Sequence, residues 1–266
     1  MSGLLRSTAT VCFREVPERE LDAGAKAECA EHWARAQSVN PSLFDGAVLL
    51  ASDLRWSGSS CEVDFFEGSY SRYHWVRCTG RRYGPGALFA SVLATTLEGA
   101  LLAGCMAETT STPGRIQLPG GNIERVRREP LDIRTAMASA ARELAEEVGI
   151  QVDTGELELT HVKSGGDHGD VGLIFSVRLP RAIPHLASVF AQHLQSLARA
   201  GATAEFSELV AVSGNWWPPG STAPFAVDYM ADAIRVALRL TGRPLRYSTE
   251  RSDVPGVRQI GVAVVA

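Results

Sequence analysis

Lysine is nearly absent from this chain: of its 26 lysine and arginine residues, only Lys26 and Lys163 are lysines. Because arginine takes the place of lysine throughout an alanine-rich sequence, we interpret this as coding bias, and a single arginine indicates little about phosphate binding. The net charge of −4 at pH 7 gives no reason to expect nucleic acid or a membrane surface as a partner.

Paired cysteines and long apolar runs are also missing. The five cysteines are widely spaced, without a CxxC motif, and an odd number without a secretory leader predicts reduced thiols. The opening MSGLLRSTATVCF contains no continuous apolar region, and no stretch reaches the roughly 18 uninterrupted apolar residues of a membrane span. These absences predict a soluble, cytoplasmic protein.

Two enzyme classes lack their signatures. The chain has no GxxxxGK[ST] motif, and no cysteine has a neighbouring histidine in an arrangement typical of a nucleophile, so neither a P-loop nor a Cys-nucleophile enzyme is expected. With 266 residues and 45% hydrophobic content, the chain can nevertheless bury a full core and has room for an additional domain.

An acidic helix is the most informative feature that is present. We expect it to begin after Asp132 as N-cap and to stop at Gly149, with Ala140, Leu144 and Val148 at steps of four forming its buried stripe. Three carboxylates lie at i, i+3 and i+4 on another face: Glu143, Glu146 and Glu147. Either they form an ordinary solvated face or they hold a hard divalent cation such as Mg2+, which prefers oxygen ligands.

Upstream, Pro119-Gly120-Gly121 predicts a tight turn where backbone can approach a ligand without an intervening Cβ. Together the turn and helix resemble the signature of the Nudix hydrolases, G-x5-E-x7-R-E-U-x-E-E-x-G-U, where U is a bulky aliphatic residue. The second half of the signature matches from Arg142 to Ile150, and Gly120 to Glu124 resembles its glycine start. The resemblance implies an α/β/α sandwich around a mixed sheet, whereas periodicity alone indicates only a mixed α and β protein.

One departure concerns the early glutamate of the signature. Gly121 and Arg142 lie 21 residues apart (142 − 121), against 14 in the pattern, and the position counted back from Arg142 holds Arg134. The candidates to replace this glutamate are three nearby acids: Glu124, Glu129 and Asp132.

The opening of the chain resembles one branch of that superfamily, the UDP-glucose pyrophosphatases, which carry a similar N-P-x-L-F-x-G segment. Here it runs from Asn40 to Gly46, and the tyrosines that follow in that branch correspond to Tyr70 and Tyr73. We therefore predict an N-terminal α+β extension at residues 1–84, a Nudix hydrolase domain at 85–242 and a C-terminal tail at 243–266.

Hydrophobic periodicity predicts further elements. Besides the acidic helix, we expect helices at 18–37, 186–200 and 226–240, and strands at 47–51, 61–67, 88–94, 100–106, 157–163 and 171–179. The strands at 88–94 and 100–106 should form a hairpin that leads into the glycine turn. Asp167, His168 and Asp170, between the last two strands, form either a simple turn or part of a site.

The Nudix resemblance implies roles for particular residues. Glu143, Glu146 and Glu147 would be catalytic and would bind Mg2+, or Mn2+, with the Gly121 carbonyl as a further ligand, while Arg142 orients the carboxylates. A late-loop carboxylate commonly joins the metal, for which Glu205 is the candidate, and Glu208 could precede the final strand. We assign substrate contacts to four residues, with the Trp216 indole available to stack on a base: Tyr70, Tyr73, Arg125 and Trp216.

The expected reaction is Mg2+-dependent hydrolysis of a diphosphate in a small nucleoside diphosphate derivative. The branch resemblance favours a nucleotide sugar such as UDP-glucose, giving UMP and glucose 1-phosphate. Two alternatives stay open: coenzyme A or ADP-ribose as the substrate, and a catalytically inactive Nudix-like module that binds or regulates. The oligomeric state and the identity of the general base are open as well.

Overall fold

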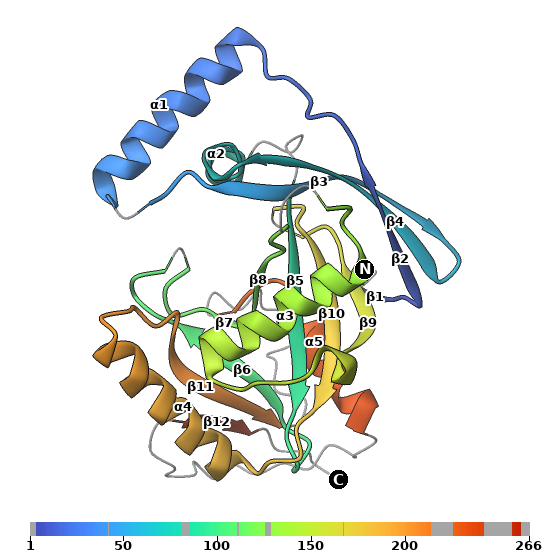
Figure 1. The fold of residues 1–266 in the computed structure, drawn as a ribbon, viewed down its shortest axis with the longest axis vertical. Helices are drawn as coiled ribbons and strands as arrows, with labels where there is room; N and C mark the ends of the chain where they lie inside the picture. The colour runs from blue at the N-terminus through green and yellow to red at the C-terminus, as the bar shows by residue number, and fades with distance from the viewer. Residues whose placement is uncertain are drawn as a thin grey trace.

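The computed structural model describes residues 4–41, 43–80, 86–110, 112–125, 129–166, 168–213, 226–241 and 257–261 (Figure 1). Its longer strands are β3 (Ala47–Ser57), β4 (Ser60–Ser69), β5 (Gly86–Thr95), β6 (Leu101–Met106), β9 (Glu158–Lys163), β10 (Val171–Arg178) and β11 (Phe206–Ser213). The shorter strands are β1 (Leu5–Ser7), β2 (Thr10–Glu15), β7 (Ile116–Gln117), β8 (Gly120–Asn122) and β12 (Val257–Gly261). The α-helices are α1 (Ala23–Val39), α2 (Tyr70–Thr79), α3 (Ile133–Val148), α4 (Ile183–Arg199) and α5 (Met230–Thr241).

The described strands form one mixed sheet with β5 at its centre. β10 runs parallel to β5, whereas β6, β8 and β3 pair with β5 in the antiparallel direction. β9 continues the sheet beyond β10, and β11 continues it beyond β6. The predicted hairpin is confirmed, since β5 and β6 pair antiparallel next to the turn that connects them.

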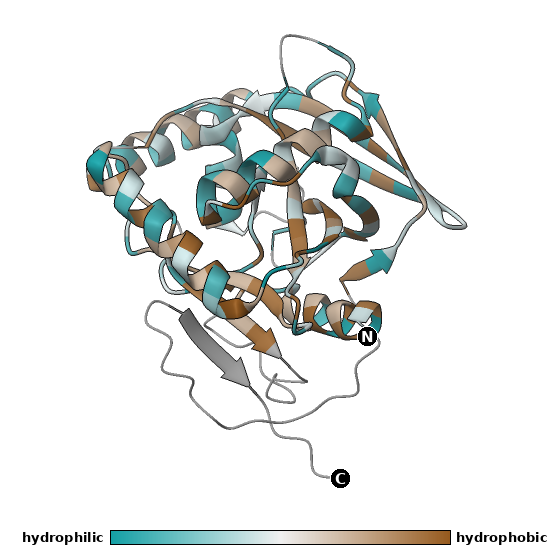
Figure 2. Ribbon diagram, turned by 60° about the horizontal axis from the view of Figure 1, so that its bottom comes forward, coloured by the Kyte–Doolittle hydropathy of each residue, from teal (hydrophilic) through white to brown (hydrophobic). Residues whose placement is uncertain are grey.

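Helices cover both faces of this sheet. Alternate residues of β5, Leu88, Ala90 and Val92, are buried in one cluster with the apolar faces of α3 and α4. Leu93, the next residue after Val92, points to the opposite face and belongs to a second cluster with Met230 of α5. Figure 2 shows polar and apolar residues mixed along these helices, as expected where one side packs on a sheet and the other meets water. The α/β/α sandwich around a mixed sheet is thereby confirmed.

An N-terminal α+β unit lies across one end of the sandwich (Figure 1). In this unit β4 pairs with β2 in parallel and with β3 in the antiparallel direction, and β3 joins the central sheet through β5. Helices α1 and α2 contact each other on the side of this unit that faces away from β2. The first strand, β1, instead pairs with β9 in the core. The boundaries at residues 84 and 242 stay a prediction.

Some element boundaries differ from the prediction because local capping decides them. The first helix begins at Ala23 and not at residue 18, since the Asp22 carboxylate accepts a hydrogen bond from the Ala25 amide at 2.8 Å. The last helix begins at Met230, because Val227 donates its amide to the Ile116 carbonyl and stays extended. The sequence did not reveal α2, although Ser69 caps it by accepting from the Arg72 amide.

The strands β1 and β2 near the N-terminus and β12, which extends the sheet beyond β11, were not predicted either. Within the part of the chain that the structure describes, no helix is both long and apolar enough to cross a membrane.

Candidate active site

Helix α3 has the ends and the buried stripe that the sequence predicts. The Asp132 carboxylate accepts from the Thr135 amide at 2.8 Å, and Gly149 ends the helix with a φ of 78°. Leu144 and Val148 are fully buried in the core. This packing fixes the rotation of α3 and so decides where its carboxylates point.

The glycine turn lies directly against α3. Strand β8 pairs with β5, and a Cβ at Gly120 would lie 2.2 Å from Ser91 Oγ. A Cβ at Gly121 would lie 2.7 Å from Glu143 Cδ. Gly120 therefore needs glycine, because its Cβ would also meet the backbone of Ala90 and Ser91, whereas a Cβ at Gly121 would displace the Glu143 carboxylate.

Glu147 is the most deeply buried carboxylate of the site. Its residue is 3% exposed, Oε2 accepts the Gly120 amide at 2.7 Å, and Oε1 has no hydrogen-bond partner. Burial raises the pKa of Glu147 well above its ordinary value, and the charge of Glu205 raises it further. A buried carboxylate with an unsatisfied oxygen and a second carboxylate beside it fits a cation or a shared proton.

Glu143 lies next to Glu147 and faces the pocket. Burial raises its pKa to about 6, while the hydrogen bond from Arg142 at 3.1 Å acts in the opposite direction. The charge of Glu205 also raises this pKa. The late-loop residue Glu205 is thus electrostatically coupled to both helix glutamates, and the structure brings together Glu143, Glu147 and Glu205.

Arg142 holds a set of carboxylates through ion pairs. Its guanidinium lies 3.1 Å from Glu143, 3.2 Å from Glu124 and 3.7 Å from Glu146. These contacts agree with a positioning role for Arg142, as the Nudix resemblance implies.

Glu146 behaves differently from the other two helix glutamates. Its side chain is 62% exposed and is drawn toward Arg142, its i,i+4 neighbour. Within the described residues, no three carboxylates bring one oxygen each to within 4.8 Å of one another. The i, i+3, i+4 spacing therefore does not make the three glutamates converge, because Arg142 draws one aside and the Gly120 amide holds another.

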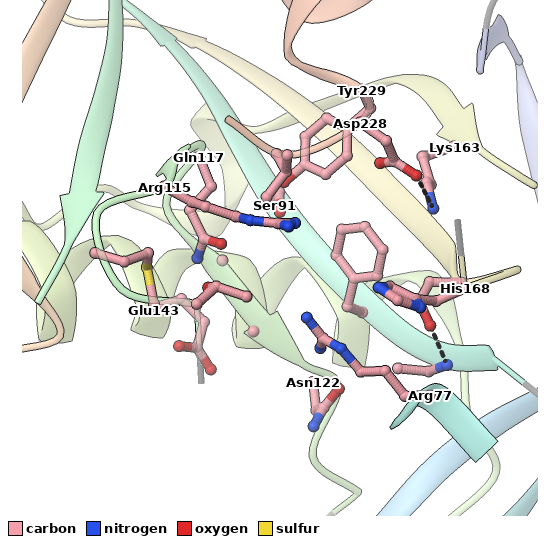
Figure 3. A pocket seen from close by; sticks show the side chains of 18 of the residues that line it. Arg77, Ser91, Arg115, Gln117, Asn122, Glu143, Lys163, His168, Asp228 and Tyr229 are labelled. Carbon is pink, nitrogen blue, oxygen red and sulfur yellow. Dashed lines mark hydrogen bonds and ion pairs between the residues drawn. The ribbon is translucent and has the colours of Figure 1, made fainter. Parts of the chain in front are cut away.

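A pocket of about 460 Å³ opens beside these carboxylates. Glu143, Glu205, Glu124 and the glycine turn line one part of it. The other walls carry cations and aromatic rings: Tyr70, Tyr73, Arg77, Phe89, Arg115, Lys163 and Tyr229. Figure 3 shows Arg77 and Arg115 entering the pocket from different walls. Such a volume suits a small ligand with both anionic and apolar parts.

The predicted substrate contacts have different outcomes. Tyr70 and Tyr73 line the pocket, as do His168 and Asp170 of the loop before β10. Arg125 does not line it, because its guanidinium pairs with Glu15 at 2.7 Å. Trp216 and Asp167 lie outside the described residues.

The cations of the pocket and one of its tyrosines were not predicted from the sequence: Arg77, Arg115, Lys163 and Tyr229. Lys163 could have been noticed in the sequence, because it is one of only two lysines in an arginine-rich chain. Its buried Nζ lies 3.5 Å from an Asp228 carboxylate oxygen. Arg77 follows Tyr73 by four residues and donates to its hydroxyl at 3.1 Å, a pairing that becomes visible only once α2 is known to be a helix.

Comparison with models of known protein families finds no match, and no curated protein matches the sequence. Among solved structures, the chain is similar to a MutT/nudix family protein from Enterococcus faecalis, with 19% identity, a TM-score of 0.30 and coverage of 36% of this chain and 38% of that one. It is also similar to a MutT protein from Methanosarcina mazei, with 16% identity, a TM-score of 0.36 and coverage of 59% and 95%. Similarity at this level does not identify a function.

Proposed function

We propose that this protein is a Nudix-type, divalent-metal-dependent hydrolase that cleaves the diphosphate of a nucleotide sugar such as UDP-glucose into UMP and glucose 1-phosphate. One observation carries the proposal: Glu143 and Glu147 lie against a glycine turn, with Glu205 close enough to raise the pKa of both, beside a pocket that also contains Arg77 and Arg115. Hydrolysis of a diphosphate needs both the carboxylates, which would hold a metal ion, and the arginines. The negative charge of the diphosphate repels a nucleophile until cations neutralise it.

The residues that would hold a divalent ion are Glu143, Glu147 and Glu205, with the Gly121 carbonyl beside them. The unsatisfied Glu147 Oε1 and the mutual repulsion of the carboxylates support this choice. Mg2+, or Mn2+ in its place, would neutralise phosphoryl charge and supply an activated water. Glu146 would belong to the site only after rotating away from Arg142.

Glu143 is our candidate for the residue that would accept a proton from the attacking water. It lines the pocket, whereas Glu147 is held by the Gly120 amide and Glu146 is turned to the surface. The Arg142 guanidinium donates a hydrogen bond to Glu143 at 3.1 Å and would hold the orientation of this carboxylate.

Glu124 is our choice for the displaced early glutamate of the Nudix signature. It lines the pocket and pairs with Arg142 at 3.2 Å. Asp132, by contrast, is already engaged as the cap of α3. The insertion after Glu124 therefore leaves a carboxylate at the site although the spacing differs.

Arg77 and Arg115 would bind the phosphate oxygens, and Tyr70 with Tyr73 would contact the base or sugar. Tyr70, Tyr73 and Arg77 all come from α2 in the N-terminal extension, whereas the carboxylates come from the core. On this division the core provides the hydrolytic chemistry and the extension selects the group attached to the diphosphate.

A substrate panel tests the proposal directly. Purified protein is incubated with UDP-glucose, ADP-ribose or coenzyme A, with and without Mg2+, and the products are separated by chromatography. We expect UMP and glucose 1-phosphate from UDP-glucose only when Mg2+ is present. Consumption of another diphosphate would move the substrate assignment, and no turnover of any of them would favour an inactive binding module.

A further inference from the structure

A cluster of two imidazoles and one thiol lies between α1 and α2, and its two histidines line a second cavity that also reaches Glu205. His32 comes from α1, while His74 and Cys78 are one helical turn apart on α2. His32 Nε2 lies 2.9 Å from His74 Nδ1, and Cys78 Sγ lies 3.9 Å from the same nitrogen. In the part of the chain that the structure describes, no other group of three His, Cys, Asp or Glu residues gathers its ligand atoms this closely.

We propose that His32, His74 and Cys78 bind a zinc ion. In an ideal tetrahedral site, ligand atoms would lie about 3.3 Å apart for a nitrogen pair and about 3.6 Å apart for nitrogen and sulfur. Small side-chain rotations would bring the observed distances of 2.9 Å and 3.9 Å to these ideal values. Imidazole and thiolate together select Zn2+ over Mg2+, which prefers oxygen.

The surroundings of the cluster suit an ion that is held by three protein ligands and keeps one open position. His74 packs against the rings of Trp33 and Tyr70, each with its centroid 5.9 Å away, which restricts the imidazole on two sides. Cys78 is exposed, so water or another small ligand can complete four-fold coordination. Three protein ligands and one exchangeable position result.

The position of the ion links it to the pocket. His74 and Cys78 lie on one stripe of α2, and Tyr70, Tyr73 and Arg77 occupy the neighbouring stripe that lines the pocket. Apart from this cluster, α1 contacts α2 through a small apolar group around Cys29, Trp75 and Val76. A bound ion would add a bridge between the two helices and so fix the wall formed by α2.

Cobalt titration distinguishes this site from the carboxylates, because only a cobalt–thiolate bond gives an intense near-ultraviolet charge-transfer band. Metal-depleted full-length protein is titrated with Co2+ and then with Zn2+ as competitor. We expect one Co2+ per chain with that band, and displacement by Zn2+. Cys78→Ser should abolish the band. His32→Ala should weaken Zn2+ binding by more than about 100-fold, which exceeds the loss expected for a residue that only hydrogen-bonds to a metal ligand.

Matched controls are Cys12→Ser, another exposed cysteine, and His185→Ala, an exposed histidine on α4; both should titrate as the parent does. Thermal unfolding provides a second measurement: Zn2+ should raise the melting temperature of the parent and of both controls, but not of Cys78→Ser. Circular dichroism verifies that each variant is folded. A folded parent without the band, or a Cys78→Ser variant that keeps it, overturns the proposal.

Discussion

Helices α3 and α2 both face the pocket, yet they reach it by different physical routes. α3 is a core helix whose stripe of Ala140, Leu144 and Val148 is fully buried, and its ends are fixed by Asp132 and Gly149. α2 lies in the extension and is buried on two sides, with Tyr73 in one cluster beside β3 and β4 and Trp75 in another cluster beside α1. A local sequence pattern thus fixes the orientation of α3, whereas α2 depends on packing between distant segments.

The two helices also supply opposite charges. α3 contributes the carboxylates that repel one another at the glycine turn, and α2 contributes Arg77 with two tyrosines. If the carboxylates carry the chemistry and α2 carries recognition, substitutions in the two helices should change different kinetic constants. Three predictions test this division, in decreasing order of effect.

The largest effect is expected in α3. Glu143→Gln should lower kcat by about 10²- to 10⁴-fold, the usual contribution of a positioned proton acceptor, because the amide keeps the shape but not the charge. Glu146→Gln, at the exposed position beside Arg142, should lower kcat far less. Steady-state kinetics at saturating Mg2+ measures both, and circular dichroism verifies the fold. Equal losses in the two variants would show that Glu146 rotates into the site.

A smaller effect is expected in α2. Arg77→Met should raise KM by about 10-fold or more with a modest change in kcat, since a hydrogen bond to a charged group contributes about 1.5–3 kcal/mol. Arg125→Met is the matched control, because Arg125 pairs with Glu15 outside the pocket. Its KM should stay near that of the parent. If kcat falls and KM does not change for Arg77→Met, the assignment of recognition to α2 is wrong.

The smallest effect on activity is expected at Asp64 of β4, which is remote from both helices. Hydrogen bonds from Arg55 and Arg14 hold the pKa of Asp64 well below its usual range. The carboxylate is therefore more acidic in the folded state, so its stabilisation is complete above the unfolded pKa of about 3.9 and is lost as the pH falls further.

The Asp64→Asn variant tests this pH dependence. Turnover should not change, while the urea midpoint should lie below that of the parent between about pH 5 and 7 and approach it below about pH 4. A midpoint difference that persists at low pH would mean that Asp64→Asn destabilises the fold by changing the packing or hydrogen bonds of this side chain and not by removing its charge.

Much of the core could be predicted from sequence, because its signals are local. The strands β5, β6 and β10 appear as apolar runs, and a cap, a stripe and a terminal glycine define α3 within a few residues of each other. Helix α2 could not be predicted in this way. Its mixed polar and aromatic residues become consistent with a helix only when β4 and α1 are in place to bury Tyr73 and Trp75.

The site divides along the same line. Sequence alone singled out Glu143, Glu147 and the glycine turn, since their spacing along one helix and one turn fixes their geometry within a short stretch. Only the tertiary structure decided that Glu146 turns to Arg142, that Arg125 pairs with Glu15 and that Arg77 enters the pocket. Those outcomes depend on contacts between segments far apart in the chain, which no local sequence pattern specifies.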